Sequence, residues 1–92
     1  MPSKIIIDGR CDSACVFLLL FKRVCYTRKA FFHGHGVFNG VGREKIYNPG
    51  LTKFYKDQFP RQLRRYFTGP VQYIPKWKID KYMGNKRCGA TA

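Results

Sequence analysis

The stretch of sequence that decides the fold runs from Ile5 to Leu20 and reads IIIDGRCDSACVFLLL. Its three successive isoleucines predict a buried strand over residues 4–8. The polar residues that follow predict a tight turn over 9–12, and the apolar run after Ser13 predicts a helix over 13–21. A serine at such a junction lies at the mouth of a sheet, beside the free backbone N–H groups that begin a helix and can stabilise an oxyanion. Taken alone, Ser13 is also typical of an ordinary helix N-cap.

The segments after this helix complete a strand–helix–strand pattern. Residues 23–27 and 30–35 are rich in β-branched, aromatic and other apolar side chains, and each predicts a strand. This order of elements favours parallel pairing with a right-handed crossover. We therefore expect an α/β fold with a small, mainly parallel sheet, in which residues 1–92 form a single domain.

The second half of the chain has a different composition, with a glycine-rich segment followed by helical segments. Residues 34–50 are rich in glycine and predict a flexible loop, which lacks the strand-then-helix context of a phosphate-binding loop. Helical segments are predicted over 51–58 and 60–67, with one more short helix after Pro75. The tail from Gly84 is polar and, apart from its cysteine, is expected to be loose.

The charge of the chain points to an alternative function. Its net charge is +13, and residues 43–92 carry 12 basic and 3 acidic side chains. Basic and aromatic residues interleave over 53–56, 64–67 and 76–78, a pattern that can contact phosphates and stack on bases. The alternative class is therefore a non-catalytic basic module that binds nucleic acid or another polyanion. A plain solvated basic surface, with the aromatic rings in the core, gives the same pattern.

No segment of the sequence predicts membrane insertion. The apolar run 14–21 ends at Lys22 and is too short to span a bilayer, which is typical of a core helix. The chain start leads directly into a strand-like run, without the charged, apolar and small-residue regions of a secretion signal. We expect no membrane span and no encoded signal peptide.

The four cysteines leave two interpretations open. In an oxidising compartment they could form two disulfides by three alternative pairings, and in a reducing cytosol they would be small buried apolar residues. Their positions are Cys11, Cys15, Cys25 and Cys88.

The two histidines are the candidate general bases. His33 and His35 lie two residues apart, so on a strand they point to the same face, and the chain order returns them to the neighbourhood of Ser13. A serine, a histidine and an acid together would make a hydrolytic triad. A zinc site formed by both histidines with Cys11 and Cys15 is a weaker alternative, because these spacings differ from the common structural pattern. We expect no metal and no other cofactor.

Several motifs resemble a known family. The Asp-Gly-Arg-Cys-Asp-Ser-Ala-Cys elbow at 8–15, the Val-Cys-Tyr-Thr block at 24–27 and the Phe/His-rich strand after Ala30 are similar to those of uncharacterised exported bacterial proteins of the Clp protease/crotonase superfamily. The resemblance covers roughly residues 4–67, with a weaker likeness near Cys88. It implies a fold like the C-terminal part of a Clp/crotonase core, serine hydrolase action on peptide or acyl bonds, and a periplasmic location.

The resemblance also implies roles for individual residues. Ser13 matches the nucleophile, and the N–H of Ala14 would be an oxyanion donor. His35 matches the catalytic histidine, with His33 as the alternative, because the family strand ends Gly-Phe-His where this chain has His-Gly-His. Asp80 lies at the end of the chain expected for the acid. The other candidate acids are Asp57 and Glu44, while Asp12 is expected to point elsewhere on the turn before Ser13.

The family's first βαβ portion, which carries a glycine pair that supplies the other oxyanion donor, is not found in this sequence. Loss of one such donor costs roughly 100- to 1000-fold in rate. We therefore expect a truncated or partial version of the domain. Its site would be either degenerate or completed by assembly into a homo-oligomer.

Overall fold

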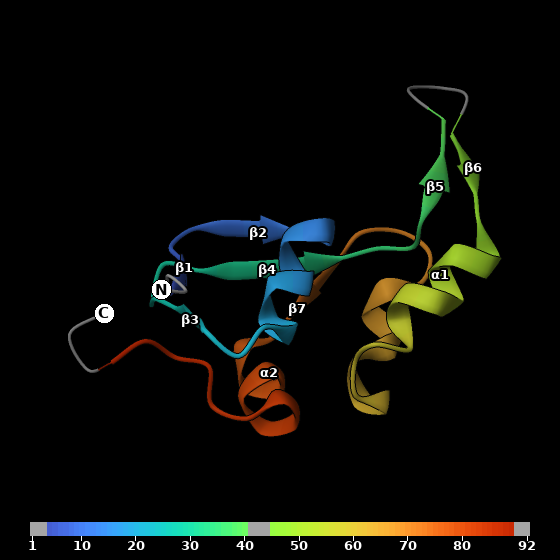
Figure 1. Ribbon diagram of the computed structural model, residues 1–92. Coiled ribbons are helices and arrows are strands. Elements are labelled where there is room, and N and C mark those ends of the chain that lie inside the picture. Colours follow the sequence, from blue (N-terminus) through green and yellow to red (C-terminus); the bar gives the residue numbers. More distant parts are fainter. Residues whose placement is uncertain (1–3, 41–44, 90–92) are drawn as a thin grey trace.

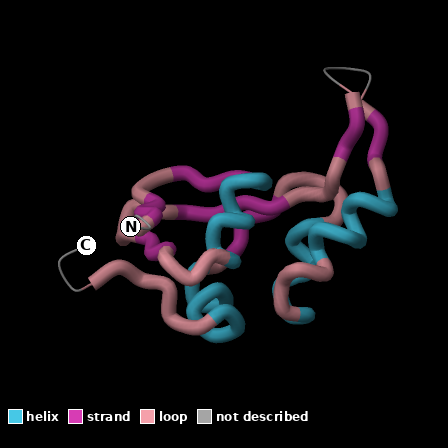
Figure 2. The backbone as a smooth tube through the Cα atoms, in the orientation of Figure 1, coloured by secondary structure: helices cyan, strands magenta, loops and turns pink. Residues whose placement is uncertain are grey.

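The computed structural model describes residues 4–40 and 45–89, and its elements are short (Figures 1 and 2). The strands are β1 (Ile5–Ile7), β2 (Arg10–Asp12), β3 (Val24–Tyr26), β4 (Phe31–Gly34), β5 (Phe38–Asn39), β6 (Ile46–Tyr47) and β7 (Gln72–Ile74). The helices are the 3₁₀ helices η1 (Ser13–Leu20) and η3 (Arg61–Phe67) and the α-helices α1 (Pro49–Lys56) and α2 (Lys76–Met83). The chain thus has the expected α/β class.

The strands form small mixed sheets in place of one mainly parallel sheet. β1 pairs in parallel with β3, and β2 pairs in parallel with β4. On its other edge β4 pairs antiparallel with β7, which gives a three-stranded sheet of order β2–β4–β7. β5 and β6 form a separate antiparallel hairpin within the segment predicted to be a loop. The parallel part of the prediction is correct, and the antiparallel strands β7, β5 and β6 were not foreseen.

The polar segment before Ser13 is a strand and not the expected turn. Residues 10–12 form β2, whose register places Cys11 beside Phe32. Side chains alternate across a strand, so one face of β2 turns inward while the other turns to solvent. Cys11 is fully buried, and Arg10 is exposed. The turn is restricted to Asp8 and Gly9, between β1 and β2.

The core lies between the β2–β4–β7 sheet and the helices. Cys11, Phe32 and Ile74 project from the inner face of the three strands and are all buried. η1 contributes Val16 and Leu19. The other large buried side chains come from β1, β3, η3, α2 and the segment before η3: Ile7, Val24, Tyr26, Phe59, Leu63, Tyr66, Phe67 and Ile79. The helices therefore cover the inner face of the sheet only.

The C-terminal segment is joined to β3. The N–H of Tyr26 donates to the carbonyl of Lys86 at 2.9 Å, and the N–H of Cys88 donates to the carbonyl of Tyr26 at 2.9 Å. A disulfide between Cys25 and Cys88 fastens the same two segments. The residues up to Cys88 are therefore not the loose tail expected from their polar composition.

The β5–β6 hairpin and α1 extend away from the three-stranded sheet (Figure 1). Asn48 caps α1 by accepting a hydrogen bond from the Leu51 N–H at 2.9 Å. The hydroxyl of the buried Thr52 accepts one from the Val37 N–H at 2.8 Å, which ties α1 to the chain that leaves β4. No helix within residues 4–40 and 45–89 has the length and apolar character needed to cross a bilayer.

Candidate functional site

Ser13 stands at a strained junction between strand and helix. It follows β2 directly and is the first residue of η1. Its φ is 51°, and it is the only residue other than glycine with a positive φ in the part of the chain that the structure describes. This left-handed conformation costs a residue with a Cβ atom about 1–2 kcal/mol. Such strain is characteristic of functional turns, where the surrounding structure holds the residue in place.

The Ser13 side chain does not cap the helix. The N-cap of η1 is Asp12, and no side chain caps the helix end. No hydrogen bond to the Ser13 hydroxyl is formed by the described residues. The simple N-cap interpretation of this serine is therefore wrong, and its hydroxyl is available for another role.

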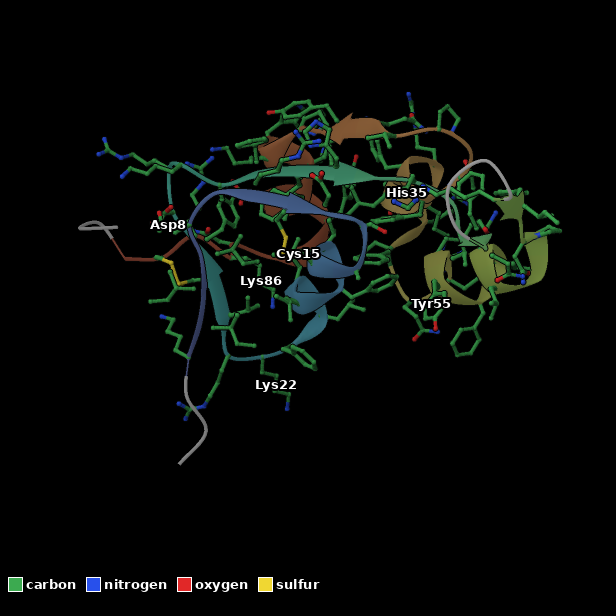
Figure 3. The ribbon with its side chains drawn as sticks, turned by 90° about the horizontal axis from the view of Figure 1, so that it is seen from above. Asp8, Cys15, Lys22, His35, Tyr55 and Lys86 are labelled. Carbon is green, nitrogen blue, oxygen red and sulfur yellow. A yellow bond between two sulfur atoms is a disulfide. The ribbon has the colours of Figure 1, made fainter. Side chains whose placement is uncertain are left out.

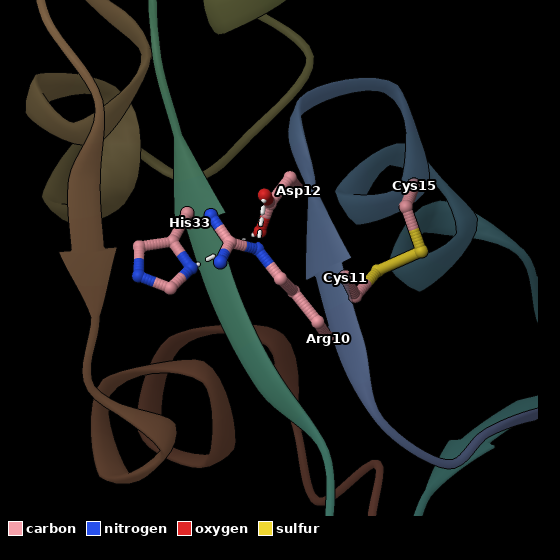
Figure 4. Close-up of a disulfide and its surroundings, with 5 residues drawn as sticks. All are labelled: Arg10, Cys11, Asp12, Cys15 and His33. Atoms are coloured by element: carbon pink, nitrogen blue, oxygen red, sulfur yellow. Dashed lines mark hydrogen bonds and ion pairs between the residues drawn. A yellow bond between two sulfur atoms is a disulfide. The ribbon is translucent and has the colours of Figure 1, made fainter.

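A disulfide encloses the junction. Cys11 on β2 and Cys15 on η1 are bonded to each other, with their Cα atoms 5.2 Å apart (Figure 4). Because the second disulfide uses Cys25 and Cys88, all four cysteines are paired. Disulfide sulfurs are not the thiolates that zinc requires, so the zinc interpretation with Cys11 and Cys15 does not fit this structure.

Ser13 and His35 line the same small cavity. Its volume is about 20 Å³, enough for roughly one water-sized group. The other lining residues are Phe17, Val37, Thr52, Tyr55 and Phe67. Figure 3 shows His35 beyond the end of β4, on the side of the molecule that carries Tyr55.

The parallel pairing of β2 with β4 explains this meeting. Asp12 is in register with His33, so the carboxyl ends of both strands reach the same edge of the sheet. Ser13 directly follows one strand, and His35 directly follows the other. The carboxyl edge of parallel strands is where side chains from separate loops converge into sites.

A backbone carbonyl fixes the tautomer of His35. Its Nδ1 atom lies 2.5 Å from the carbonyl oxygen of Gly36. A carbonyl can only accept a hydrogen bond, so Nδ1 carries the proton and donates it. The Nε2 atom of the neutral ring is then left with its lone pair, which is the form that a general base requires. Sequence reasoning missed this partner because a backbone carbonyl leaves no side-chain signal.

His33 belongs to a different cluster and does not line the cavity that Ser13 and His35 share, although the two histidines were expected on one face. Its Nδ1 atom lies 3.0 Å from the Oδ1 atom of Asp12, and the Nε atom of Arg10 donates to the Oδ2 atom of Asp12 at 2.6 Å (Figure 4). The hydrogen bond from Arg10 holds the pKa of Asp12 below its ordinary value, and His33 adds to this effect. The hydrogen bonds of the Asp12 carboxylate go to Arg10 and His33. Its pairing with His33 was missed because β2 was expected to be a turn.

The predicted acids bind elsewhere. The Asp80 carboxylate accepts hydrogen bonds from the Tyr26 hydroxyl and, at 2.8 Å, from the Nε atom of Arg87. Asp57 pairs with Lys53 at 2.8 Å, at the end of α1. Glu44 lies outside the described residues. The placement of Asp80 beside His35 is therefore not supported, and the Gly36 carbonyl occupies the position of the third group.

A larger open depression also includes His35. Its volume is about 340 Å³, and Phe38, Lys45, Pro70 and Val71 line the rest of it. The three apolar residues among these can accept an apolar group, and the lysine supplies a positive charge at the wall.

The aromatic rings of the interleaved basic and aromatic segments differ in their exposure to solvent. Tyr66 and Phe67 are buried in the core, and Lys78 donates to the Tyr66 hydroxyl at 2.7 Å. In contrast, Phe54 and Trp77 are exposed. The aromatic residues of segment 64–67 are thus structural, and the predicted nucleic-acid contact through them is wrong.

Comparison with known proteins assigns the chain to no family. No protein family, no curated protein and no solved structure matches the chain. The resemblance to the Clp/crotonase superfamily therefore stays a prediction drawn from the sequence motifs.

Proposed function

We propose that this chain is a serine hydrolase-type domain that cleaves peptide or acyl bonds, with Ser13 as nucleophile and His35 as general base. One observation carries the proposal. A serine held at a positive φ, with no hydrogen bond to the described residues, shares a small cavity with a histidine whose tautomer leaves Nε2 as a proton acceptor. The combination of a nucleophile, a base and a group that orients the base is the general pattern of covalent acyl transfer.

In the proposed reaction, the Ser13 Oγ atom attacks the carbonyl carbon of the substrate while its proton passes to Nε2 of His35. The imidazolium that forms is stabilised by its Nδ1–H bond to the Gly36 carbonyl. The backbone N–H of Ala14, in the first turn of η1, is the proposed donor to the oxyanion. His35 then protonates the leaving group, and water hydrolyses the acyl-serine with His35 again as base.

The Gly36 carbonyl, as the group that orients His35, predicts a modest rate of hydrolysis. A neutral carbonyl stabilises an imidazolium less than a carboxylate does, because only the carboxylate places a full negative charge beside the ring. We therefore propose a slow hydrolase, with a dyad in place of a full triad. Its scissile bond would lie at the 20 Å³ cavity, and an adjoining apolar group would occupy the 340 Å³ depression.

The two disulfides support a location in an oxidising compartment, because such bonds rarely persist in a reducing cytosol. A periplasmic or other exported location is thus part of the proposal.

A fluorophosphonate probe with intact-mass detection tests the proposed function, because it reports an activated serine without knowledge of the substrate. The sequence contains two serines, so Ser3→Ala is a matched control for Ser13→Ala. We expect one adduct on the oxidised protein, lost in Ser13→Ala and kept in Ser3→Ala. No adduct on the folded protein, or an adduct that survives in Ser13→Ala, would overturn the proposal.

A further inference from the structure

The three-stranded sheet has one face that no described helix covers. Cys11, Phe32 and Ile74 point from β2, β4 and β7 into the core. The alternate residues point the other way and form what we term the outer sheet face: Arg10, Asp12, Phe31, His33 and Tyr73. Figure 4 shows Arg10, Asp12 and His33 gathered on this side, with the disulfide and η1 on the other.

Three rings lie next to one another on the outer sheet face. The ring centroids of Phe31 and His33 are 5.8 Å apart, and those of His33 and Tyr73 are 5.9 Å apart. The register explains this row, because Tyr73 is the partner of His33 across the β4–β7 ladder. Phe31 is 38% exposed and Tyr73 is 53% exposed, so both rings are accessible from solvent. Neighbouring rings meet nearly edge to face, at interplanar angles of 83° and 69°, so the row is a set of separate π-surfaces and not one flat platform.

Basic side chains border this row. Arg10 is in register with Phe31, and Arg28 and Lys29 are exposed in the turn that leads into β4. The only carboxylate on the outer sheet face, Asp12, is already paired with Arg10 and His33. The ion pair engages the Nε atom of Arg10, so the guanidinium keeps its other donors. The net charge of the whole chain is +13, which also favours an anionic ligand.

We propose that the outer sheet face binds single-stranded nucleic acid. Successive bases would stack on Phe31, His33 and Tyr73, and Arg10, Arg28 and Lys29 would contact the phosphates. Exposed rings on a sheet with basic residues at its border suit unpaired bases, since every base offers a π-face. A duplex keeps its bases stacked on one another and could use only the charges. This surface is separate from the Ser13 cavity, so the proposal does not depend on hydrolase activity.

Fluorescence anisotropy of labelled oligo(dT) and oligo(U), each about ten nucleotides long, tests the proposal. Loss of one stacking ring should weaken binding roughly 5- to 100-fold in Tyr73→Ala and in Phe31→Ala. Phe54→Ala is the matched control, because Phe54 is an exposed aromatic residue on α1 and lies outside the outer sheet face. It should bind within about twofold of the unmodified protein.

Four further variants separate stacking from charge. Arg28→Gln should reduce the dependence of affinity on salt by about one phosphate contact, whereas Arg61→Gln, on η3, should change it less. Tyr73→Leu and Phe31→Leu keep an apolar side chain and should bind as weakly as the alanine variants. If thermal melting shows that Phe31→Ala or Tyr73→Ala does not fold, the two leucine variants test the stacking contribution in their place.

Three results would overturn the proposal. The first is no binding to either oligonucleotide at about 50 mM salt, where electrostatic attraction is strong. The second is an equal effect of Tyr73→Ala and Phe54→Ala, which would mean that charge alone attracts the nucleic acid. The third is equal affinity for heparin or anionic phospholipid vesicles, with no effect of Tyr73→Leu. Ser13→Ala should bind the oligonucleotides unchanged, so a failed hydrolase test leaves this result intact.

Discussion

Cys11 and Cys15 form a disulfide that closes a short covalent ring around Ser13, the one residue other than glycine with a positive φ in the described part of the chain. One sulfur comes from the middle residue of β2 and the other from the first turn of η1. The ring joins the two elements whose junction is strained. A constraint of this kind helps an unfavourable backbone conformation to persist, because relaxation of Ser13 would have to move both cysteines.

The first prediction concerns this disulfide. Cys11→Ala/Cys15→Ala should lower the free energy of unfolding by about 2 kcal/mol, since the closed loop is short and loop entropy rises with loop length. It should also slow fluorophosphonate labelling, because Ser13 can then leave its left-handed conformation. Urea unfolding and the labelling rate below the unfolding transition measure the two effects. An unchanged labelling rate would show that the ring does not hold the nucleophile.

The second prediction concerns the other disulfide, which joins residues 63 apart in sequence. Cys25→Ala/Cys88→Ala should lower the free energy of unfolding by about 4 kcal/mol, because the closed loop is much longer. The segment around Arg87 should also leave β3. The labelling rate of the protein that remains folded should not change, since neither cysteine lines the cavity that contains Ser13. The variant therefore serves as the control for the first prediction.

The third prediction compares two glycines. A Cβ atom on Gly34 would collide with the carbonyl oxygen of Tyr66 and would lie 3.1 Å from the Phe67 ring. Because neither group is the free end of a flexible side chain, Gly34→Ala should destabilise the protein by about 1–3 kcal/mol. It should also slow labelling, since η3 or the chain that carries His35 must shift.

Gly9→Ala is the matched control, because an added Cβ atom there meets nothing within 4 Å. It should be neutral or stabilise the fold by less than about 1 kcal/mol, through a smaller entropy of the unfolded chain. Thermal unfolding of both variants checks the pair. Equal effects of Gly34→Ala and Gly9→Ala would mean that β4 and η3 are not packed as closely as described.

The elements with strong local signals were predictable from the sequence. The β-branched run before Asp8, the apolar run after Ser13 and the proline before the last helix each mark an element that the structure contains. β2 and β7 have three residues each, which is too few for an alternating pattern to identify a strand from the sequence. They are strands because β4 lies between them and supplies their partners, which is information that a local pattern cannot carry.

The candidate site likewise contains residues that the sequence identified and groups that it did not. Ser13 and His35 follow from motif and chain order. The Gly36 carbonyl and the Asp12–His33 pair depend on the register of β2 with β4, which the sequence does not fix. Asp80 was placed by resemblance, but in this fold Tyr26 and Arg87 surround its carboxylate and satisfy it.

The fourth prediction concerns Tyr26 at high pH. Burial, followed by the hydrogen bond to Asp80, raises the pKa of the Tyr26 phenol above its ordinary value of 10.0. The folded state therefore keeps this proton when the unfolded state has lost it. The resulting stabilisation is complete below pH 10 and decreases as the pH rises beyond 10 toward the pKa of the folded state.

Tyr26→Phe removes this titration and leaves the other side chains of the protein unchanged. Its free energy of unfolding should be lower by about 1–2 kcal/mol at neutral pH, because the bond to Asp80 is lost. Its further decrease above pH 10 should be less steep than that of the unmodified protein. Urea unfolding at a series of alkaline pH values measures both slopes. Parallel slopes would contradict the assigned environment of Tyr26.

The last prediction separates the two histidines. His35→Gln removes the proposed base, so the rate of fluorophosphonate labelling at Ser13 should fall roughly 100- to 10,000-fold. His33→Gln should change that rate by less than about tenfold, because His33 is bonded to Asp12 on the outer sheet face and does not line the cavity with Ser13. Glutamine can still donate a hydrogen bond to Asp12, so this variant should keep the β2–β4 pairing. The comparison depends on equal folding, which thermal melting of both variants verifies. If His33→Gln were the variant that loses labelling, the base would lie outside the cavity that Ser13 and His35 share, and that cavity could not be the site of reaction.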